Sequence, residues 1–445
     1  MTDTPISAFL DEYRKKNAVR LHMPGHKGAG GIAEGLDITE IEGADSLFEA
    51  SGIIEESERI AGNIFGADTF YSTEGSSLSI RAMLYLVSLY AKRNGRSAVI
   101  AATRNAHKAF TSAAALIDFR VDWISSENSS YLSSGIGRED IVRYFGNTKE
   151  LPVALYLTSP DYLGFICDVK AIAEECHKRG VLLIVDNAHG AYLKFLVPSI
   201  HPIELGADMC CDSAHKTLDA LTGCAYFHIS KSAPAFFKER AKDAMMLFAS
   251  TSPSYLMLNS LDRLNASLSE NYKEKLLRFT KKIACLKADL ISHGYVLAGD
   301  EPMKITVATK KYGYRGTEIS SYLSSLEIFA EFSDPDYLVL MLSPENSDGE
   351  LKRLKDALLS LPKKTVATES APSVHIPKKA CSIREAVMSD SEDLPISECV
   401  GKVAAALTAG CPPAIPIAVP GEIIDEKMLD VFKYYGITKF RVIKQ

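Results

Sequence analysis

The chain of 445 residues is 47% hydrophobic and 24% charged, proportions typical of a globular protein that buries a large core. This length suits two or three domains, and the composition excludes disorder as a description of the whole. A net charge of −6 provides no overall basic surface, so we expect no nucleic-acid partner. No apolar run approaches the ~20 residues of a membrane helix, and the N-terminus lacks the apolar core of a signal peptide. We therefore expect a cytoplasmic protein with no membrane partner.

The cysteine and histidine patterns predict no metal site. The nine cysteines are an odd number without a C-x-x-C pair, which indicates reduced thiols packed in the core. His22 and His26 are four residues apart, but Pro24 and Gly25 lie between them and exclude the shared helix face of a zinc helix.

The first 60 residues are predicted to form an N-terminal arm and loops, with a short amphipathic helix capped by Thr4 or Ser7. From Glu56 onward the pattern alternates regularly between helix and strand. The predicted elements are helix 56–66, strand 68–73, helix 77–95, strand 97–102, helix 105–117, strand 120–125, helix 138–146, strand 152–159, helix 168–180 and strand 181–186. This alternation predicts an α/β fold with a mostly parallel sheet covered by helices on both faces.

The character of the chain changes towards the C-terminus. Residues 251–295 read as a long helix, followed by a second α/β region with strands 303–309 and 337–343. A polar, proline-containing stretch at 361–377 is the best candidate for a linker. The predicted division is an arm at 1–60, a major domain at 61–270, a small α/β domain at 271–365 and a C-terminal domain at 366–445.

The strongest signal for chemistry lies between Asp186 and Lys216. Asp186 ends a buried strand, and ligands of open α/β sheets lie at that edge. Lys216 follows thirty residues later, flanked by Ser213, His215 and Thr217. An acid followed by a lysine among hydroxyls suits pyridoxal phosphate, since the lysine forms the Schiff base and the acid keeps the pyridine nitrogen protonated. A solvated surface lysine is the alternative.

Two further segments could contribute to such a site. In residues 72–77, Gly75 permits a tight turn, and Ser76 and Ser77 offer hydroxyls and N–H groups for a phosphate at a helix N-terminus. Simple N-capping explains the same serines equally well. His107 begins the next predicted helix, where its imidazole either stacks on a cofactor ring or serves as a cap.

A set of motifs in chain order resembles one known family. The motifs are HMPGHK (22–27), RNAHK (104–108), TSPDYLG (158–164), VDNAHG (185–190), SAHKTL (213–218), TSPSYL (251–256) and PPAIPIAVPGE (412–422). Together they resemble the ornithine/lysine/arginine decarboxylases of pyridoxal-phosphate fold type I, in their short form without a wing domain. The resemblance implies a large domain with a mostly parallel sheet and smaller C-terminal α/β domains.

The resemblance also implies roles for individual residues. Lys216 would be the Schiff-base lysine and Asp186 the partner of the pyridine nitrogen, with His107 and Ala188 on the two faces of the ring. Residues that would hold the phosphate or otherwise bind the cofactor are Gly75, Ser76, Ser77, His189, Ser213 and His215. Thr251 and Ser252 would reach the neighbouring subunit's phosphate in a homodimer. On the substrate side, His22 and His26 would line the entrance and Glu422 would meet the distal cation.

The activity implied is decarboxylation of arginine, lysine or ornithine to an amine of polyamine metabolism. The substrate stays open, because the acids that could hold its cation, Glu422, Asp45 and Asp161, are not placed by sequence. The proton donor to Cα, Lys216 or His215, is equally open. The alternatives are an aminotransferase or lyase of the same fold, with Arg441 as a carboxylate clamp, and a catalytically silent regulatory relative.

Several positions depart from the family pattern. Leu78 stands where many relatives have Gly, and GADSL (43–47) has one acid where relatives have two. Glu74 stands beside the predicted phosphate site, where an acid is unfavourable unless its side chain turns away. Asp161 replaces a usual Thr, and Asn187 replaces a usual Glu. These changes bear on the substrate more than on the cofactor set.

Overall fold

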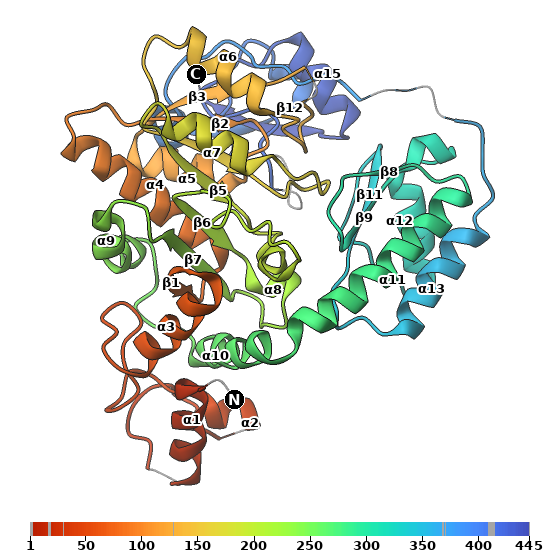
Figure 1. Cartoon of the computed structure of the whole chain (residues 1–445). Helices are drawn as coiled ribbons and strands as arrows, with labels where there is room; N and C mark the ends of the chain where they lie inside the picture. The colour runs from red at the N-terminus through yellow and green to blue at the C-terminus, as the bar shows by residue number, and fades with distance from the viewer. Residues whose placement is uncertain are drawn as a thin grey trace. The chain divides into compact units, whose positions relative to one another are not determined.

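The computed structural model describes residues 3–16, 19–29, 31–127, 129–366, 369, 371–407 and 414–444. Figure 1 labels the helices and strands along the chain. The chain divides into two compact units, which are described separately. Unit 1 comprises residues 1–97, 153–155 and 169–276, and unit 2 comprises 98–152, 156–168 and 277–445. The predicted domain boundaries remain a prediction.

Unit 1 contains the arm and the larger part of the main sheet. Its elements are α1 (Pro5–Lys15), α2 (Ile32–Leu36), α3 (Ile53–Phe65), β1 (Ala67–Ser72), α4 (Gly75–Arg93), α7 (Val169–His177), β5 (Leu182–Asp186), the 3-10 helix η1 (Ala191–Phe195), β6 (Met209–Asp212), α8 (Ala214–Thr217), β7 (Ala225–Ser230), α9 (Ala235–Met246), α10 (Tyr255–Glu270) and the start of α11 (Tyr272–Ser292).

Unit 2 contains the rest of the main sheet and the C-terminal half of the chain. Its elements are β2 (Val99–Thr103), α5 (Lys108–Ile117), β3 (Arg120–Ile124), α6 (Arg138–Asn147), β8 (Leu297–Ala298), β9 (Lys304–Ala308), η2 (Thr309–Tyr312), α12 (Gly316–Ser325), β10 (Phe332–Ser333), β11 (Tyr337–Met341), α13 (Asp348–Ser360), α14 (Ile383–Met388), β12 (Ser391–Pro395), η3 (Ile396–Glu398), α15 (Glu426–Tyr434) and β13 (Lys439–Ile443). Strand β4 (Ala154–Thr158) has residues in both units.

The main sheet has seven strands in the order β1-β7-β6-β5-β4-β2-β3. Neighbours β5 and β6 are parallel, as are β2 and β3, whereas β7 runs antiparallel to both β1 and β6. Every residue of β5 and β6 is buried, as expected for strands covered on both faces. The mostly parallel α/β sheet predicted from the alternation is therefore confirmed, and β7 is the strand that the pattern did not predict.

The arm packs on unit 1 through one face of α1. Ile6 and Leu10 are buried, and the backbone N–H of Ser7 donates to Oδ2 of Asp262 on α10 at 2.9 Å. Thr4 occupies the N-cap position but its side chain makes no capping bond, and Ser7 lies inside the helix. The predicted helix exists, and Ser7 bonds to α10 instead of capping α1.

One other prediction needs adjustment. The long helix expected over residues 251–295 consists of α10 and α11, which are separated at Asn271. The predicted strands at 303–309 and 337–343 are present as β9 and β11, paired in a four-stranded sheet of order β10-β11-β9-β8.

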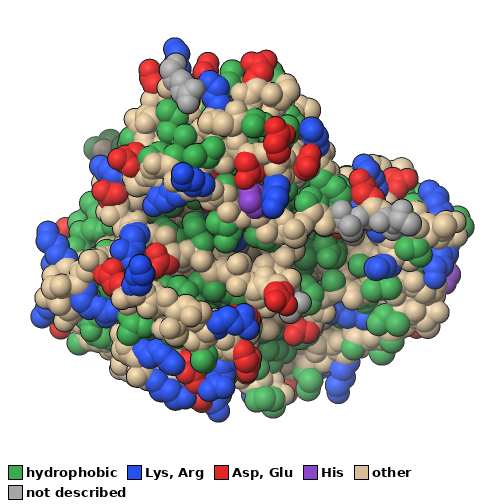
Figure 2. Space-filling model, turned by 90° about the horizontal axis from the view of Figure 1, so that it is seen from above, with side chains coloured by type: hydrophobic (Ala, Val, Ile, Leu, Met, Phe, Trp, Pro, Cys, Tyr) green, Lys and Arg blue, Asp and Glu red, His purple; other side chains and the backbone are tan. Residues whose placement is uncertain are grey.

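The charged side chains on one face of the molecule are mixed in sign (Figure 2), and the described cysteines are free, as the sequence predicts. On the face shown in Figure 2, acidic and basic side chains are interspersed among apolar ones. Within the described residues, no helix has both the length and the apolar character that crossing a bilayer would require. The eight described cysteines are free, and five of them are buried: Cys176, Cys210, Cys211, Cys224 and Cys399. Cys411 lies outside the described residues, as do Pro412 and Pro413 of the C-terminal motif.

Candidate active site

The site in unit 1 is built on the ends of two neighbouring parallel strands. Asp186, the last residue of β5, pairs in register with Cys211 of β6, so the loops after both strands leave from one edge of the sheet. The Asp186 side chain is buried, and its Oδ1 accepts the backbone N–H of Ala188 at 3.2 Å and the thiol of Cys211 at 3.7 Å. Burial and the nearby Asp186 charge raise the pKa of Cys211 well above its usual value, so this thiol keeps its proton.

Lys216 and His189 lie together at this edge. Nζ of Lys216 is 2.9 Å from Nε2 of His189, a hydrogen-bond distance. His189 is buried three residues beyond Asp186, and Lys216 is half-buried in the short helix α8. The predicted cofactor lysine is therefore held by the VDNAHG loop rather than exposed on the surface.

The predicted phosphate residues also come together. The Ser213 hydroxyl donates to Oγ of Ser76 at 2.8 Å, which joins the loop after β6 to the first turn of α4. Gly75 has a φ of +68°, and its N–H donates to the carbonyl of Gly223 at 2.8 Å. A Cβ at position 75 would lie 4.0 Å from Cε1 of His215, so this turn lies close to the imidazole. Ser77 follows in α4 and is partly buried.

One ring nitrogen of His215 is hydrogen-bonded within the protein. Nδ1 lies 2.9 Å from the carbonyl of Cys224, to which it donates, and this leaves Nε2 for a ligand. Burial lowers the pKa of His215, although the bond to Cys224 acts in the opposite direction. A bound phosphate dianion would favour the protonated ring, whose Nε2 can donate a hydrogen bond.

A buried polar network supports the two strand ends. Asn187 donates through Nδ2 to Oδ1 of Asp212 at 2.6 Å, and Oδ2 of Asp212 lies 3.0 Å from Nε2 of His201 and 3.2 Å from Nε2 of His228. Burial acts to raise the pKa of Asp212, but the two imidazoles outweigh it and hold this pKa below its usual range. Sequence reasoning missed this network, although an acid directly before Ser213 was a visible signal.

Glu74 turns towards the loop that precedes α10. Its Oε1 accepts the backbone N–H of Ser250 at 2.7 Å, and its side chain is exposed. The carboxylate is thus engaged by a donor next to the TSPSYL motif. Thr251 and Ser252 of that motif are exposed, and their role in a neighbouring subunit stays a prediction.

His107 lies in unit 2 as the N-cap of α5. Its Nδ1 accepts the backbone N–H of Ala109 at 3.1 Å, so the capping alternative is realised. In the neutral ring the proton must then be on Nε2. This bond fixes the orientation of the imidazole and is compatible with a second role for its ring face.

Glu422, nominated for the substrate cation, is already paired inside unit 2. Its two carboxylate oxygens lie 2.7 Å and 3.1 Å from Nη1 and Nη2 of Arg104, and both side chains are buried. A substrate cation would have to compete with this bidentate guanidinium. Sequence reasoning missed Arg104, although it stands in the same RNAHK motif as His107.

The other acids nominated for the cation also have structural partners. Carboxylate oxygens of Asp45 accept backbone N–H groups at the start of α3, including those of Gly52 and Ile54 at 2.9 Å. Oδ1 of Asp161 accepts the N–H groups of Leu163 and Phe165, each at 3.0 Å. Both acids therefore shape their own loops.

The predicted entrance histidines bond within the arm. Nε2 of His22 lies 2.7 Å from the Tyr13 hydroxyl, and Nε2 of His26 lies 3.3 Å from Oδ2 of Asp37. Their proposed contact with substrate stays a prediction. Arg441, the candidate carboxylate clamp of an aminotransferase, instead forms a bidentate ion pair with Asp393 across β12 and β13.

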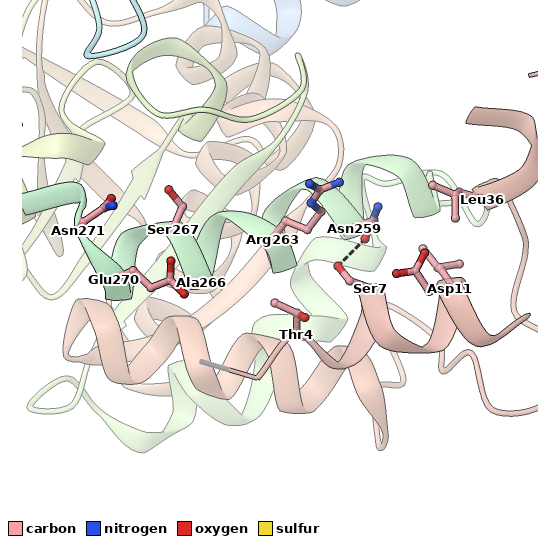
Figure 3. Close-up of a pocket in the computed structure, with 11 residues that line it drawn as sticks. Thr4, Ser7, Asp11, Leu36, Asn259, Arg263, Ala266, Ser267, Glu270 and Asn271 are labelled. Carbon is pink, nitrogen blue, oxygen red and sulfur yellow. Dashed lines mark hydrogen bonds between the residues drawn. The ribbon is translucent and has the colours of Figure 1, made fainter. Parts of the chain in front are cut away.

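A polar cavity of about 640 Å³ lies elsewhere in unit 1, between α1 and α10 (Figure 3). Ser7 and Asn259 line it, and the Ser7 hydroxyl donates to Oδ1 of Asn259 at 2.6 Å (Figure 3). Arg263 and Glu270 of α10 also line it. None of the predicted cofactor residues lines this cavity, so we assign it to the docking of the arm.

The residues present fit pyridoxal phosphate. A buried carboxylate, a lysine amine and a set of hydroxyls beside a positive-φ glycine at a helix N-terminus meet the needs of a pyridinium nitrogen, an aldehyde and a phosphate. Ser76, Ser213 and His215 would hold the phosphate, and Asp186 would hold the ring nitrogen.

Comparison with known families decides the assignment. Residues 4–294 match the Orn/Lys/Arg decarboxylase major domain, and residues 363–440 match the C-terminal domain of the same family. The chain belongs to the Orn/Lys/Arg decarboxylase family. It is accordingly a decarboxylase, and basic amino acids are the substrates for which the family is named.

The relatives in this family include several arginine decarboxylases. The chain is 30% identical over 462 residues to the arginine decarboxylase of Halalkalibacterium halodurans, covering 96% of this chain and 92% of that protein. It is 29% identical to the arginine decarboxylase of Bacillus subtilis, covering 97% and 93%. The match to the constitutive lysine decarboxylase of Escherichia coli is 24% identical and covers 61% of this chain and 41% of that one. The resemblance to the short form of the family is confirmed.

Solved structures show the same fold. The lysine decarboxylase of Francisella novicida superimposes with a TM-score of 0.80 at 17% identity, over 99% of this chain and 81% of that one. The constitutive lysine decarboxylase of Escherichia coli gives a TM-score of 0.77 at 18% identity, over 99% and 82%. At these identities the likeness establishes the fold, which is fold type I of pyridoxal-phosphate enzymes, as predicted.

Proposed function

We propose that this chain binds pyridoxal phosphate through Lys216 and decarboxylates arginine to agmatine for polyamine metabolism. The observation that favours arginine as the substrate is the similarity to two arginine decarboxylases, at 30% and 29% identity. Each match covers more than nine-tenths of both proteins. The match to the lysine decarboxylase of Escherichia coli has a lower sequence identity and covers a smaller part of both proteins. Lysine and ornithine are the other substrates to be compared.

The cofactor would supply an electron sink for the pair of electrons left on Cα when carbon dioxide departs. Asp186 would keep the ring nitrogen protonated, which a buried carboxylate at 2% exposure can do effectively because little water competes for the proton. Ser76 and Ser213 would hold the phosphate and so restrain the ring. Ala188 and His107 would contact its two faces.

Lys216 is also the better candidate for returning a proton to Cα. Its Nζ is 2.9 Å from Nε2 of His189, which can hold or supply a proton at that atom. His215 has Nδ1 bound to the Cys224 carbonyl and a lowered pKa caused by burial, so it carries a transferable proton less readily. We therefore assign the proton transfer to Lys216 and the orientation of its amine to His189.

A homodimer is part of this proposal. Four apolar side chains in the arm are largely exposed: Val19 at 84%, Leu21 at 90%, Met23 at 60% and Ile32 at 74%. Large exposed apolar side chains gathered in one segment are typical of an interface, and a second copy would cover them. Thr251 and Ser252 would then reach the partner's phosphate. The free cysteines support a reducing, cytoplasmic location.

The substrate is tested by measuring kcat/KM for carbon dioxide release from arginine, lysine and ornithine side by side. We expect arginine to exceed the other two by at least about tenfold, which corresponds to ~1.4 kcal/mol of transition-state binding. A preference for lysine or ornithine would refute the substrate, and keto acid formation would refute the reaction class.

The dimer is tested by mixing inactive variants after reversible dissociation. Lys216→Ala mixed with Thr251→Ala/Ser252→Ala gives one intact site per mixed dimer if the motif acts in the neighbouring subunit. About a quarter of wild-type activity should return, since half of the dimers are mixed and each has one of two sites. No recovery, with a monomeric mass by light scattering, would contradict the proposal.

A further inference from the structure

The C-terminal domain holds helix α5 at both of its ends. At the N-terminus, the backbone N–H of Lys108 donates to the carbonyl of Ala414 at 2.8 Å. At the C-terminus, Nη1 of Arg384 donates to the carbonyls of Ala115 at 3.1 Å and Leu116 at 3.0 Å. The first N–H groups and last carbonyls of a helix lack partners within the helix, so these bonds complete α5 from outside.

The loop that leads into α5 is held by a second set of bonds. Arg104 forms the bidentate pair with Glu422, and its Nη2 also donates to the carbonyl of Ile417 at 3.0 Å. Its guanidinium carbon lies 5.1 Å from the ring centre of Trp123, within cation–π range. The Glu422 carboxylate is fixed in turn by the N–H of Val419 at 2.8 Å.

This pair joins residues that are 318 positions apart in the chain, and one of them, Arg104, stands three positions before His107. Arg104 and Glu422 have 2% and 5% of their side chains exposed, so neither charge is satisfied by water if its partner is removed. Charge-assisted bonds with a fork geometry also restrain direction, because two parallel contacts fix the plane of the guanidinium.

We propose that Arg104, Glu422 and Arg384 are positioning residues through which the C-terminal domain fixes the imidazole of His107. The bond from the backbone N–H of Ala109 to Nδ1 restrains the ring, and this restraint moves with the helix. The position of helix α5 itself is fixed by contacts to the C-terminal domain, which are made by Ala414, Ile417, Glu422 and Arg384. This inference rests on the proposed function, in which His107 contacts the cofactor ring. It gives Glu422 a role distinct from binding the substrate cation.

The experiment is a double-variant cycle between Glu422 and His107. Glu422→Gln and His107→Ala are made singly and together, and each is measured for kcat, KM for arginine and the dissociation constant of pyridoxal phosphate by absorbance titration. Glu422→Gln should lower kcat by about 10- to 100-fold and weaken cofactor binding severalfold, with KM within about twofold of wild type. In the His107→Ala background, Glu422→Gln should have little further effect on either quantity.

Two further variants serve as a second test and as a negative control. Arg104→Lys keeps the charge but lacks the fork, so it should reproduce the Glu422→Gln effect even if Glu422→Gln folds poorly. Arg441→Gln removes a bidentate pair of the same domain that is exposed and joins β12 to β13, and it should leave kcat and cofactor binding unchanged.

The outcomes separate this inference from the proposed function. A wild-type protein that binds pyridoxal phosphate and releases carbon dioxide, but whose variants have additive effects, overturns the inference alone. A Glu422→Gln protein with a raised KM and a normal kcat also overturns it, because that pattern indicates direct contact with substrate. A wild-type protein that binds no pyridoxal phosphate overturns both.

Discussion

The side-chain amide of Asn187 donates a 2.6 Å hydrogen bond to Oδ1 of Asp212, joining the residue after Asp186 to the residue before Ser213. The other oxygen of Asp212 is shared by His201 and His228, and all of these side chains are buried. Only a donor at position 187 is compatible with this carboxylate. The departure from the Glu usual in the family pattern thus has a local reason.

Asn187→Asp should therefore be strongly destabilising. Two carboxylates would meet at hydrogen-bond distance in a buried site, which should lower the free energy of unfolding by about 3 kcal/mol at pH 7. Asn187→Asp/Asp212→Asn restores one donor and one acceptor, so it should recover part of that loss. Urea unfolding measures all three proteins, and a fully stable Asn187→Asp would show that the bond does not restrain the strand ends.

Ser213→Ala should weaken pyridoxal-phosphate binding by about tenfold, the effect of losing one hydrogen bond to a charged group. Its hydroxyl lies 2.8 Å from that of Ser76, so both serines face the same proposed phosphate position. Ser79→Ala is the matched control. Ser79 lies in α4, as Ser76 does, and its buried hydroxyl has no hydrogen-bond partner among the described residues. Absorbance titration of cofactor-free protein gives both constants, and equal affinities would remove Ser213 from the site.

His189→Gln should lower kcat by about 10²-fold while cofactor binding stays close to that of wild type. The reason is that His189 orients the Lys216 amine and exchanges protons with it, whereas our proposal assigns the phosphate to Ser76, Ser213 and His215. His293→Gln, at an exposed position, serves as the control. A His189→Gln enzyme with normal kcat would show that Lys216 needs no partner at this position.

Asp161 should make the stability of the fold depend on pH. Burial raises its pKa to about 6, although hydrogen bonds from Ser133 and the backbone act to lower it. In the unfolded chain an Asp titrates near pH 4, so between about pH 4 and 6 the folded state binds more protons. The contribution of Asp161 to the free energy of unfolding therefore falls as pH rises through this window and stays low above it.

Asp161→Asn removes this effect. Between pH 4.5 and 7, the free energy of unfolding of wild type should fall by about 2 kcal/mol relative to that of the variant. Asp348→Asn, at an exposed helix N-terminus, is the control. Parallel stability curves for wild type and Asp161→Asn would show that the buried carboxyl keeps an ordinary pKa.

Much of the site in unit 1 could be predicted because it depends on local patterns. The run before Asp186 is apolar and ends in an acid, which predicts both the strand and the edge at which its last residue lies. The register of β5 with β6 then brings Ser213 to the same edge. The glycine and serines at residues 75–77 begin α4 as expected from helix-start preferences.

The rest depends on tertiary pairing that no local pattern reports. Arg104 and Glu422 are 318 positions apart, and nothing in either segment indicates the other as its partner. His201 directly precedes the turn at 202–206, and His228 lies in β7, where the antiparallel register places it opposite Cys210 of β6. That both rings meet at Asp212 is therefore a tertiary arrangement. For the same reason Glu422, Asp45 and Asp161 looked available for a substrate cation, whereas each is bonded within its own unit.

The central claim is that Lys216 performs a decarboxylation, and its most direct test is the stoichiometry of arginine turnover by wild type and Lys216→Ala. With pyridoxal phosphate present, wild type should release one carbon dioxide and one agmatine for each arginine consumed. Lys216→Ala should lose at least about 10³-fold of that rate, since the residue both bonds the cofactor and moves the proton. Wild type that consumes arginine without releasing carbon dioxide, or Lys216→Ala with undiminished activity, would contradict the account.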